Sequence, residues 1–263
     1  MKFPRSTYYK ALVRVPSNRQ LEADKFKAEI KKIWTDSKAR YGAPKIHQVL
    51  ISQGKSISLK RVQRYMIDMG LRSIVIKKFR YHSERITTDQ KKNILNRDFS
   101  TTGINQKWCT DITYIHTVRD GWTYLASVMD LHSKKIIGYA YDISMTAELA
   151  MQAVKNACLN VKVTEGILLH SDLGTQYTSK IFEDYLSLKG ITHSFSRKGN
   201  PYDNACIESF HSVLKKEEIN HHKYSDFNAA RKVVFEYIES WYNRKRIHGA
   251  INYLTPQAAH EAA

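Results

Sequence analysis

The chain has 263 residues, of which 42% are hydrophobic and 11% aromatic. This content excludes global disorder and allows one sizeable core plus one smaller domain. Lysine and arginine number 42 against 25 acidic residues, a net charge of +17, which is typical of proteins that bind nucleic acid or an anionic membrane. We find no apolar run near the length of a membrane span and expect no signal peptide, so nucleic acid is favoured and no membrane partner is expected.

The positive charge is concentrated at one end of the chain. Residues 1–100 contain 24 basic and 8 acidic residues, whereas residues 101–263 contain 18 and 17. This asymmetry predicts a basic nucleic-acid-binding arm joined to a nearly neutral domain.

The cysteine pattern argues against disulfides and zinc. The three cysteines, Cys109, Cys158 and Cys206, are odd in number and far apart. They form no Cys-x-x-Cys pair or cysteine–histidine cluster. We therefore expect reduced, buried thiols.

Three amphipathic helices are expected in the N-terminal region, residues 1–70. The first covers about 20–38. The second starts at Pro44, a residue that suits the first turn of a helix. The third follows the predicted N-cap Ser58 and stops at Gly70.

The last two of these helices, within about 41–70, have the outline of a helix-turn-helix. The second helix of the pair exposes polar and basic side chains that are able to reach DNA phosphates or base edges. They are Lys60, Arg61, Gln63 and Arg64. A small helical bundle with a solvated basic face is the alternative.

Residues 71–104 show a weaker pattern and are expected to form a basic linker. In this stretch Lys77, Lys78 and Arg80 surround an aromatic residue. The linker either lies along DNA or is a solvated loop.

The pattern changes after Asn105. Strands are expected at about 108–116, 121–130, 135–142, 167–170 and 192–196, and helices at about 146–160, at about 179–189 and after Asn204. This β-β-β-α-β-α-β-α order over residues 105–222 is the element order of the ribonuclease H-like α/β fold with a mixed sheet. A C-terminal helix and basic tail are expected over 223–263.

Three acidic residues lie where such a fold would bring them together. Asp111 falls in the alternating run of the first strand, and Asp172 follows the short buried run at 167–170. Glu208 lies on a helix whose apolar stripe is Cys206, Ile207, Phe210, Val213 and Leu214. The opposite face is expected to carry Glu208, His211, Ser212 and Lys215.

Carboxylates that converge from separate elements are typical of a magnesium site. Mg²⁺ prefers oxygen ligands, and two ions about 4 Å apart can activate the attacking oxygen and stabilise the leaving oxygen of a phosphoryl transfer. Without a cation, such carboxylates would repel one another and raise one another's pKa. The alternative is three ordinary solvated acids.

Long motifs surround these acids and resemble one family of enzymes. The segments are Gln106–Ile115, His170–Ser179 and Ser196–Phe210, together with the tail Tyr242–Ala250 followed by Leu254-Thr255-Pro256. They resemble the second-open-reading-frame (OrfB) transposases of the insertion-sequence-three family, which belong to the DDE integrase and transposase superfamily. The segment from Tyr41 to Arg72 resembles the helix-turn-helix of that family.

The resemblance implies roles for individual residues. Asp111, Asp172 and Glu208 match the catalytic acidic triad that binds two Mg²⁺ ions, for which Mn²⁺ can substitute. Lys215 matches a basic position that contacts DNA, with a solvated helix lysine as the alternative. The DNA-contact set implied in full is Lys60, Arg61, Arg64, Lys215, Arg244 and Arg246. His170 and Ser171 are expected to shape the turn that presents Asp172.

The resemblance also implies an activity and partners. A DNA transposase of this family cleaves the 3′ end of an insertion sequence and transfers the strand to target DNA. It acts on double-stranded element ends and target as a homo-oligomer, in the bacterial cytoplasm at the nucleoid. Two alternatives remain: a non-catalytic DNA-binding regulator of transposition, and a metal-dependent nuclease without joining activity.

Two departures refine this expectation. Retroviral integrases carry a His-His-Cys-Cys zinc module, which this sequence lacks, so the transposase branch fits better. In the family, the enzyme is often a frameshift fusion with an upstream frame (OrfA) that carries a leucine zipper. Since no sustained heptads occur here, the chain is expected to be the catalytic part, with OrfA as partner or fusion.

Overall fold

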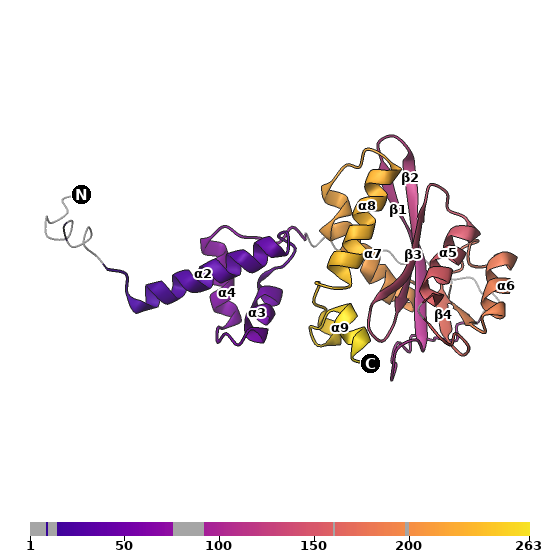
Figure 1. The fold of residues 1–263 in the computed structure, drawn as a ribbon, viewed down its shortest axis with the longest axis horizontal. Coiled ribbons are helices and arrows are strands. Elements are labelled where there is room, and N and C mark those ends of the chain that lie inside the picture. The colour runs from indigo at the N-terminus through magenta and orange to yellow at the C-terminus, as the bar shows by residue number, and fades with distance from the viewer. Residues whose placement is uncertain (1–8, 10–14, 76–91, 160, 198–199) are drawn as a thin grey trace. The chain divides into compact units, whose positions relative to one another are not determined.

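The structure is a computed structural model that describes residue 9 and residues 15–75, 92–159, 161–197 and 200–263 (Figure 1). The chain divides into two compact units, Met1–Ile76 and Lys77–Ala263. The expected basic cluster around Lys77, Lys78 and Arg80 lies outside the described residues. None of the described helices is long and apolar enough to cross a membrane.

The N-terminal unit contains three helices, α2 (Asn18–Asp36), α3 (Ala43–Ser52) and α4 (Leu59–Asp68), as predicted. The Ser58 hydroxyl caps α4 by accepting the Arg61 N–H at 3.3 Å. Gly70, at φ +67°, lies just beyond the end of α4, in the left-handed region that suits glycine. The three helices bury a shared apolar set: Ile30, Ile46, Leu50, Val62, Tyr65 and Met66.

The second unit is built on a mixed sheet of order β3-β2-β1-β4-β5. The strands are β1 (Lys107–Thr117), β2 (Gly121–Asp130), β3 (Ile136–Asp142), β4 (Leu168–Ser171) and β5 (Thr192–Phe195). β2 runs antiparallel to both β1 and β3, and β4 and β5 extend the sheet in parallel with β1. β1 pairs with β2 from Trp108 to Thr117, but with β4 only from Lys107 to Cys109.

Helices cover both faces of this sheet (Figure 1). α5 (Ala147–Cys158) and α6 (Lys180–Leu188) pack on one face, where Trp108, Leu169, Val154 and Phe182 are buried in one core. α7 (Ala205–Glu217) and α8 (Phe227–Glu236) lie on the other face. The element order predicted for the core is confirmed.

The C-terminal region is not a solvated tail. After α8 the chain forms the π-helix η3 (Tyr237–Tyr242), the 3₁₀ turn η4 (Gly249–Ile251) and α9 (Pro256–Glu261). The side-chain amide of Asn243 accepts the Ile136 N–H at 3.1 Å and donates to the Ile136 carbonyl at 3.0 Å. The region expected as a basic tail is thus bonded to β3.

The last part of the expected linker 71–104 packs on the sheet of the second unit. Leu95 is buried. The backbone N–H groups of Ile94 and Leu95 donate to the Ser194 hydroxyl on β5 at 3.0 and 2.9 Å. These hydrogen bonds link positions about a hundred residues apart, so no local pattern could show them.

A glycine allows β3 and α5 to approach closely. A Cβ atom added at Gly138 would lie 2.4 Å from both the Ala153 carbonyl oxygen and the Ala157 nitrogen. Because these atoms belong to the helix backbone, rotation of a side chain would not relieve the clash.

We expect Gly138→Ala to destabilise the second unit by at least about 1–3 kcal/mol, the usual cost of overpacking a core. Urea unfolding would measure this loss. The control is Gly103→Ala, where the added Cβ would meet only the Gln106 side chain at 3.7 Å. Equal stability of the two variants would contradict the close packing of β3 on α5.

Candidate active site

The fold brings the three predicted acids to one edge of the sheet. Asp111 lies on β1 just past Cys109, where the pairing with β4 ends. Asp172 directly follows β4, and Glu208 lies in the first turn of α7, which packs against β1 and β2. Since β1 and β4 are neighbouring parallel strands, the end of β4 necessarily lies beside the middle of β1.

The acids influence one another electrostatically. The pKa of Glu208 is raised, first by burial and then by the negative charges of Asp111 and Asp172. The pKa of Asp172 is also raised. The chief cause is that surrounding protein atoms keep water from the carboxylate, even though the residue as a whole is exposed, and the charge of Asp111 adds to it. Carboxylates that lie close to one another raise a neighbour's pKa in this way.

Two of the three carboxylates also have local partners. The Ile112 N–H donates to Asp111 Oδ1 at 2.8 Å, and His211 Nδ1 lies 3.3 Å from Asp111 Oδ2. The Gly174 N–H donates to Asp172 Oδ1 at 3.0 Å. Within the described part of the chain, no group of three or more His, Cys, Asp and Glu side chains is arranged to hold a metal ion.

His211 lies on the face of α7 that was expected to carry it together with Glu208 and Lys215, and it is buried there. Its ring packs against the sheet, with Nε2 3.4 Å from the Ser127 hydroxyl and Nδ1 facing Asp111. The apolar-stripe count did not predict this burial because it treats histidine as polar. The contact with Asp111 makes burial of the ring favourable.

Asn204 connects the start of α7 to the acid-bearing strand. Its side-chain N–H donates to the Thr110 carbonyl at 3.1 Å, one residue before Asp111. Its side-chain oxygen is buried and has no hydrogen-bond partner among the described residues. A buried acceptor of this kind normally pairs with a proton donor or a cation.

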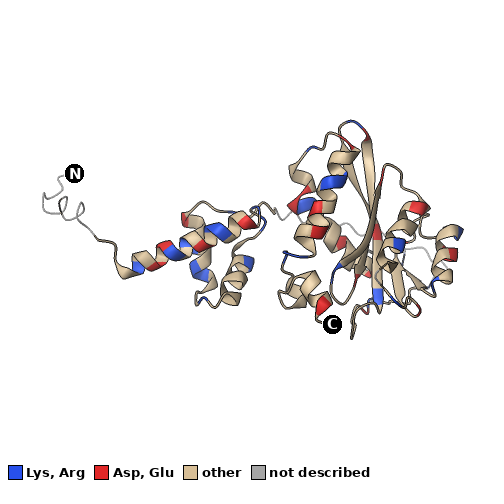
Figure 2. Cartoon of the chain, in the orientation of Figure 1, with Lys and Arg blue, Asp and Glu red and all other residues tan. Residues whose placement is uncertain are grey.

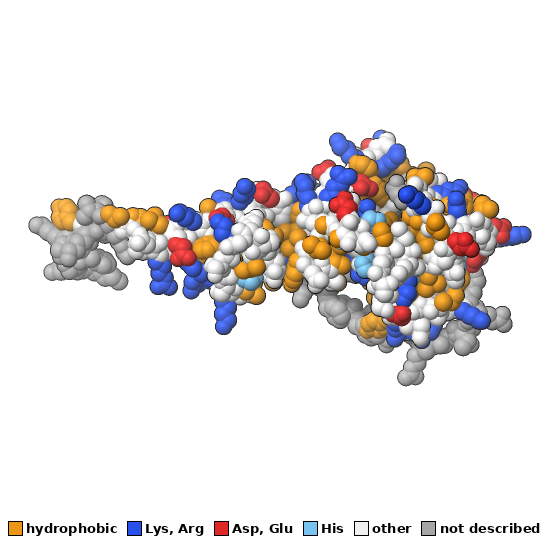
Figure 3. All heavy atoms as spheres, turned by 60° about the horizontal axis from the view of Figure 1, so that its bottom comes forward, with side chains coloured by type: hydrophobic (Ala, Val, Ile, Leu, Met, Phe, Trp, Pro, Cys, Tyr) orange, Lys and Arg blue, Asp and Glu red, His pale blue; other side chains and the backbone are white. Residues whose placement is uncertain are grey.

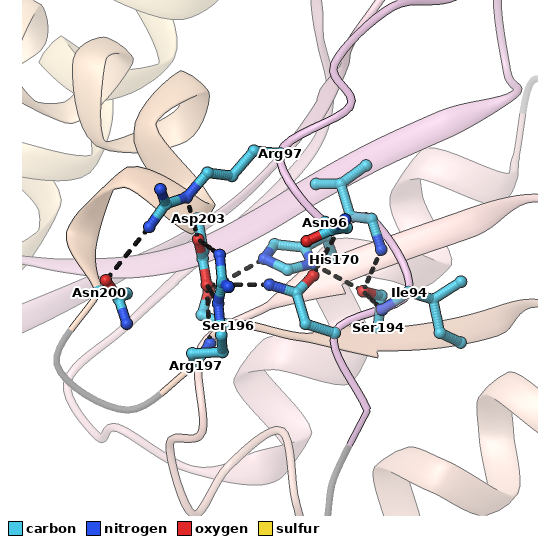
Figure 4. A network of polar contacts seen from close by, with 11 residues as sticks. Ile94, Asn96, Arg97, His170, Ser194, Ser196, Arg197, Asn200 and Asp203 are labelled. Carbon is cyan, nitrogen blue, oxygen red and sulfur yellow. Dashed lines mark hydrogen bonds and ion pairs between the residues drawn. The ribbon is translucent and has the colours of Figure 1, made fainter. Parts of the chain in front are cut away.

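Buried hydrogen bonds also hold the turn that presents Asp172. His170 is fully buried, and its two ring nitrogens lie 2.9 Å from the hydroxyls of Ser194 and Ser196 (Figure 4). The Ser171 hydroxyl donates to the Asp172 carbonyl at 2.8 Å. This is the shaping role that was expected of His170 and Ser171.

A buried carboxylate, which the sequence patterns did not single out, fixes the segment ahead of Glu208. Asp203 accepts from Arg97 Nε and from the Arg197 side chain and backbone, and it also pairs with Asn93 (Figure 4). Its pKa lies far below the usual range because these hydrogen bonds outweigh the opposing effect of burial. Asp203 thereby joins residues 93–97 to the turn that leads into α7.

Comparison with known proteins identifies the family. Residues 101–201 and 189–256 match two integrase core domain families, and residues 22–79 match an HTH-like domain family. The chain is 36% identical to the transposase for insertion sequence element IS904 of Lactococcus lactis, over 93% of this chain and 96% of that protein. The chain belongs to the IS3 family of insertion-sequence transposases.

Other relatives agree with this assignment. The transposase is 40% identical to transposase InsF for insertion sequence IS3A of Escherichia coli K12, over 85% of this chain and 78% of that protein. It is 34% identical to a 31 kDa protein of insertion element IS600 from Shigella sonnei, over 98% and 94%.

A solved structure confirms the ribonuclease H-like integrase fold. The transposase is similar to a chain of the simian T-cell lymphotropic virus intasome in complex with PP2A regulatory subunit B56 gamma. The TM-score is 0.50 at 13% sequence identity, covering 89% of this chain and 75% of that one.

Lys215 lies on α7 beyond Glu208, as predicted, and close to the acids. Its ammonium group lies 4.0 Å from the ring centroid of Tyr114. Burial lowers the pKa of Lys215, and the charge of Asp111 opposes that shift. The lysine is therefore not a fully solvated helix residue.

The basic residues of the C-terminal motif have different environments. Arg244 is exposed. Arg246 is buried, with Nη2 3.0 Å from Glu217 Oε1, and the same carboxylate accepts from Tyr237 and Trp241. A DNA contact was expected of Arg246, but its position supports a structural role, because its guanidinium group neutralises a buried carboxylate.

The recognition-helix residues of the N-terminal unit also differ. Lys60 and Arg64 are exposed on α4. Arg61 is held by Glu22 of α2 at 3.1 Å and by the Tyr65 hydroxyl at 2.7 Å. Basic side chains lie along α2 and α4 together with acidic ones (Figure 2), and basic side chains also project from this unit in the space-filling view (Figure 3). Lys60 and Arg64 are therefore better placed for a DNA contact than Arg61.

The buried His170 predicts a pH dependence of stability. Burial lowers its pKa from 6.5 to about 4, so the unfolded chain binds the proton more tightly. This pKa difference contributes about 3 kcal/mol to the free energy of unfolding above about pH 6.5, and the contribution is lost as the pH falls toward 4. Urea unfolding in EDTA at a series of pH values would measure it. His170→Gln should show a shallower loss over that range; an unchanged slope would contradict this assignment.

Proposed function

We propose that Asp111, Asp172 and Glu208 are the catalytic triad of a DDE-type polynucleotidyl transferase. The observation that carries this proposal is their convergence at one sheet edge, with Asp111 raising the pKa of both other acids. The integrase core families that match this part of the chain support the same activity.

The donor chemistry of these residues fits magnesium, although the described side chains are not gathered around one ion site. The three groups offer only carboxylate oxygens, which Mg²⁺ prefers to nitrogen or sulfur ligands. The pKa of Asp172 and of Glu208 is raised first by burial and then by the neighbouring negative charge, and a cation would offset both effects. Asn204 Oδ1 is a further buried oxygen without a partner among the described residues. To share an ion, Asp111 and Asp172 would turn away from their local partners. We infer two ions, with Mn²⁺ able to substitute.

The reaction proceeds in two phosphoryl-transfer steps. Water first attacks the phosphodiester at the end of the element and breaks its P–O3′ bond, which leaves a 3′-hydroxyl on the element and a 5′-phosphate on the flanking DNA. This hydroxyl then attacks a phosphodiester of the target DNA, forming a new P–O bond and releasing a 3′-hydroxyl of the target strand. Two Mg²⁺ ions, when bound, supply activation of the attacking oxygen and stabilisation of the leaving oxygen. His211 orients Asp111 on β1, and Lys215 places a positive charge where a DNA phosphate would approach the acids.

The partners follow from this chemistry. We propose that the N-terminal unit binds duplex DNA through exposed side chains of α4, including Lys60 and Arg64, and that Arg244 adds a contact from the C-terminal region. Element ends must be paired for transposition, so the active form is a homo-oligomer on DNA. An upstream-frame (OrfA) protein is the proposed partner or fusion, and the bacterial nucleoid is the proposed place of action.

Replacing each acid by its amide tests the triad. Mg²⁺-dependent cleavage and joining should be abolished in each of the variants Asp111→Asn, Asp172→Asn and Glu208→Gln, because amides bind the cation poorly. DNA retention should stay within a few-fold of wild type. Incubation with element-end DNA followed by gel analysis measures both products. Joined strands identify a transposase, and cleavage alone identifies a nuclease. Binding without either product identifies a regulator, and full activity in any variant contradicts the triad.

Charge reversal at Lys215 tests its DNA contact. Lys215→Glu should weaken binding to duplex DNA about tenfold and reduce the dependence of the affinity on salt, because one phosphate contact is lost. Mn²⁺ affinity, measured by calorimetry, should change little. The matched control is Lys216→Glu on the same helix. A fall in Mn²⁺ affinity without a change in DNA binding would place Lys215 at the metal and not at the phosphate.

A further inference from the structure

A groove follows the C-terminal half of β1, next to the proposed active site. Its volume is about 640 Å³, within the range of small-molecule pockets and large enough for a nucleotide. Its walls are formed by β1, β2, α7 and the turn after α7. The lining residues that matter here are Tyr114, His116, Trp122, Lys215, Asn220 and Lys223.

Two large aromatic side chains of this groove face solvent. Tyr114 is 55% exposed and Trp122 is 54% exposed, although both lie on central strands of the sheet. Apolar surface of this extent, gathered in one groove, is typical of a binding site.

The orientation of the indole is fixed by its neighbours. Trp122 lies edge-to-face with Tyr114, with ring centroids 5.1 Å apart and planes at 88°, and with His116 at 4.9 Å and 79°. His116 and Trp122 are direct cross-strand partners in the β1–β2 ladder. The Lys215 ammonium lies over the ring of Tyr114, so Trp122 is the ring better placed to receive a planar ligand.

The groove is complementary to an anion. Lys215 and Lys223 line it, and none of its described lining residues is acidic. His222, which also lines the groove, lies 3.4 Å from Glu218, and Lys215 senses the charge of Asp111. Aromatic rings beside lysines suit a nucleotide, whose base stacks while its phosphate pairs with a cation.

The groove is connected to the acids through Lys215. Tyr114 lies three residues after Asp111 on β1, so its ring is on the opposite face of that strand, whereas Lys215 follows Glu208 by two turns on α7 and its ammonium group lies 4.0 Å from the Tyr114 ring centroid. Lys215 belongs to the groove and also senses the charge of Asp111. A DNA strand whose phosphodiester lies at the acids would therefore extend its next nucleotides toward Trp122.

We propose that this groove binds an unpaired nucleotide of the DNA substrate, with its base stacked on Trp122 and its phosphate near Lys215 and Lys223. The inference rests on the proposed function, since it assumes that DNA is cleaved at the neighbouring acids. It assigns to Trp122 the role of selecting DNA ends whose terminal bases have left the duplex.

The geometry of stacking favours an unpaired occupant. Inside a duplex, both faces of each base are covered by neighbouring pairs, and a duplex end offers only the outer face of its last pair, whereas an extruded or single-stranded base can enter the groove and stack on the indole. A groove that needed only duplex phosphates would require its lysines and not an oriented indole.

Binding of two probes tests the proposal. The probes are a short blunt duplex and the same duplex with an unpaired oligothymidine tail, both labelled with fluorescein and titrated with the full chain in EDTA. Wild type should bind the tailed probe about tenfold more tightly than the blunt one, and Trp122→Ala should remove most of this preference. A 2-aminopurine base in the tail should be quenched by wild type and not by Trp122→Ala.

Controls separate stacking from general damage. Phe235→Ala removes an aromatic residue that is 57% exposed on α8, outside the groove, and should leave the tail preference unchanged. Trp122→Phe should retain part of it, and Trp122→Ala should keep the salt dependence of blunt-duplex binding. An equal tail preference in wild type and Trp122→Ala overturns the proposal. A change in oligomeric state of Trp122→Ala without a change in tail preference also overturns it and identifies a second copy as the occupant.

The two proposals fail independently. If Asp111→Asn keeps the tail preference but loses cleavage, the groove and the triad are both supported. If cleavage depends on the acids but no tail preference is found, only the groove proposal is refuted. If the tail preference depends on Trp122 but Asp111→Asn cleaves fully, only the triad proposal is refuted.

Discussion

The arrangement of this transposase depends on how far β1 pairs with each of its neighbours. It forms a long antiparallel ladder with β2 but a parallel ladder of only three residue pairs with β4. Where the second ladder ends, Asp111 on β1 and Asp172 at the end of β4 become neighbours, and α7 can place Glu208 beside them. The same early end allows side chains farther along β1 to line an open groove. The difference in length between the two ladders thus creates both the proposed active site and the groove.

Local signals were sufficient for most elements of the fold. Alternation predicted β1 to β3, the N-cap at Ser58 predicted the start of α4, and a short apolar run predicted β4. The three acids could be found because each had a recognisable local setting and because the motifs around them are long. These features are encoded within about ten neighbouring residues, so the sequence alone reveals them.

Contacts between distant polar side chains were not predictable in this way. His211 is buried because Asp111 and Ser127 face it from the sheet, and Arg246 is buried because Glu217 requires a counter-charge. Asp203 joins residues 93–97 to the turn before α7, so part of the expected linker supports the proposed active site. A basic or polar residue in a motif is therefore not necessarily a ligand contact, and its partner must be known before its role is assigned.

Asn243 illustrates a further consequence of such contacts. β3 is the outermost strand on its side of the sheet, and exposed backbone at a sheet edge invites pairing with other chains. By bonding to both the N–H and the carbonyl of Ile136, the Asn243 amide imitates one residue of a neighbouring strand. The C-terminal motif, which reads as a string of basic residues, therefore also covers the start of this sheet edge.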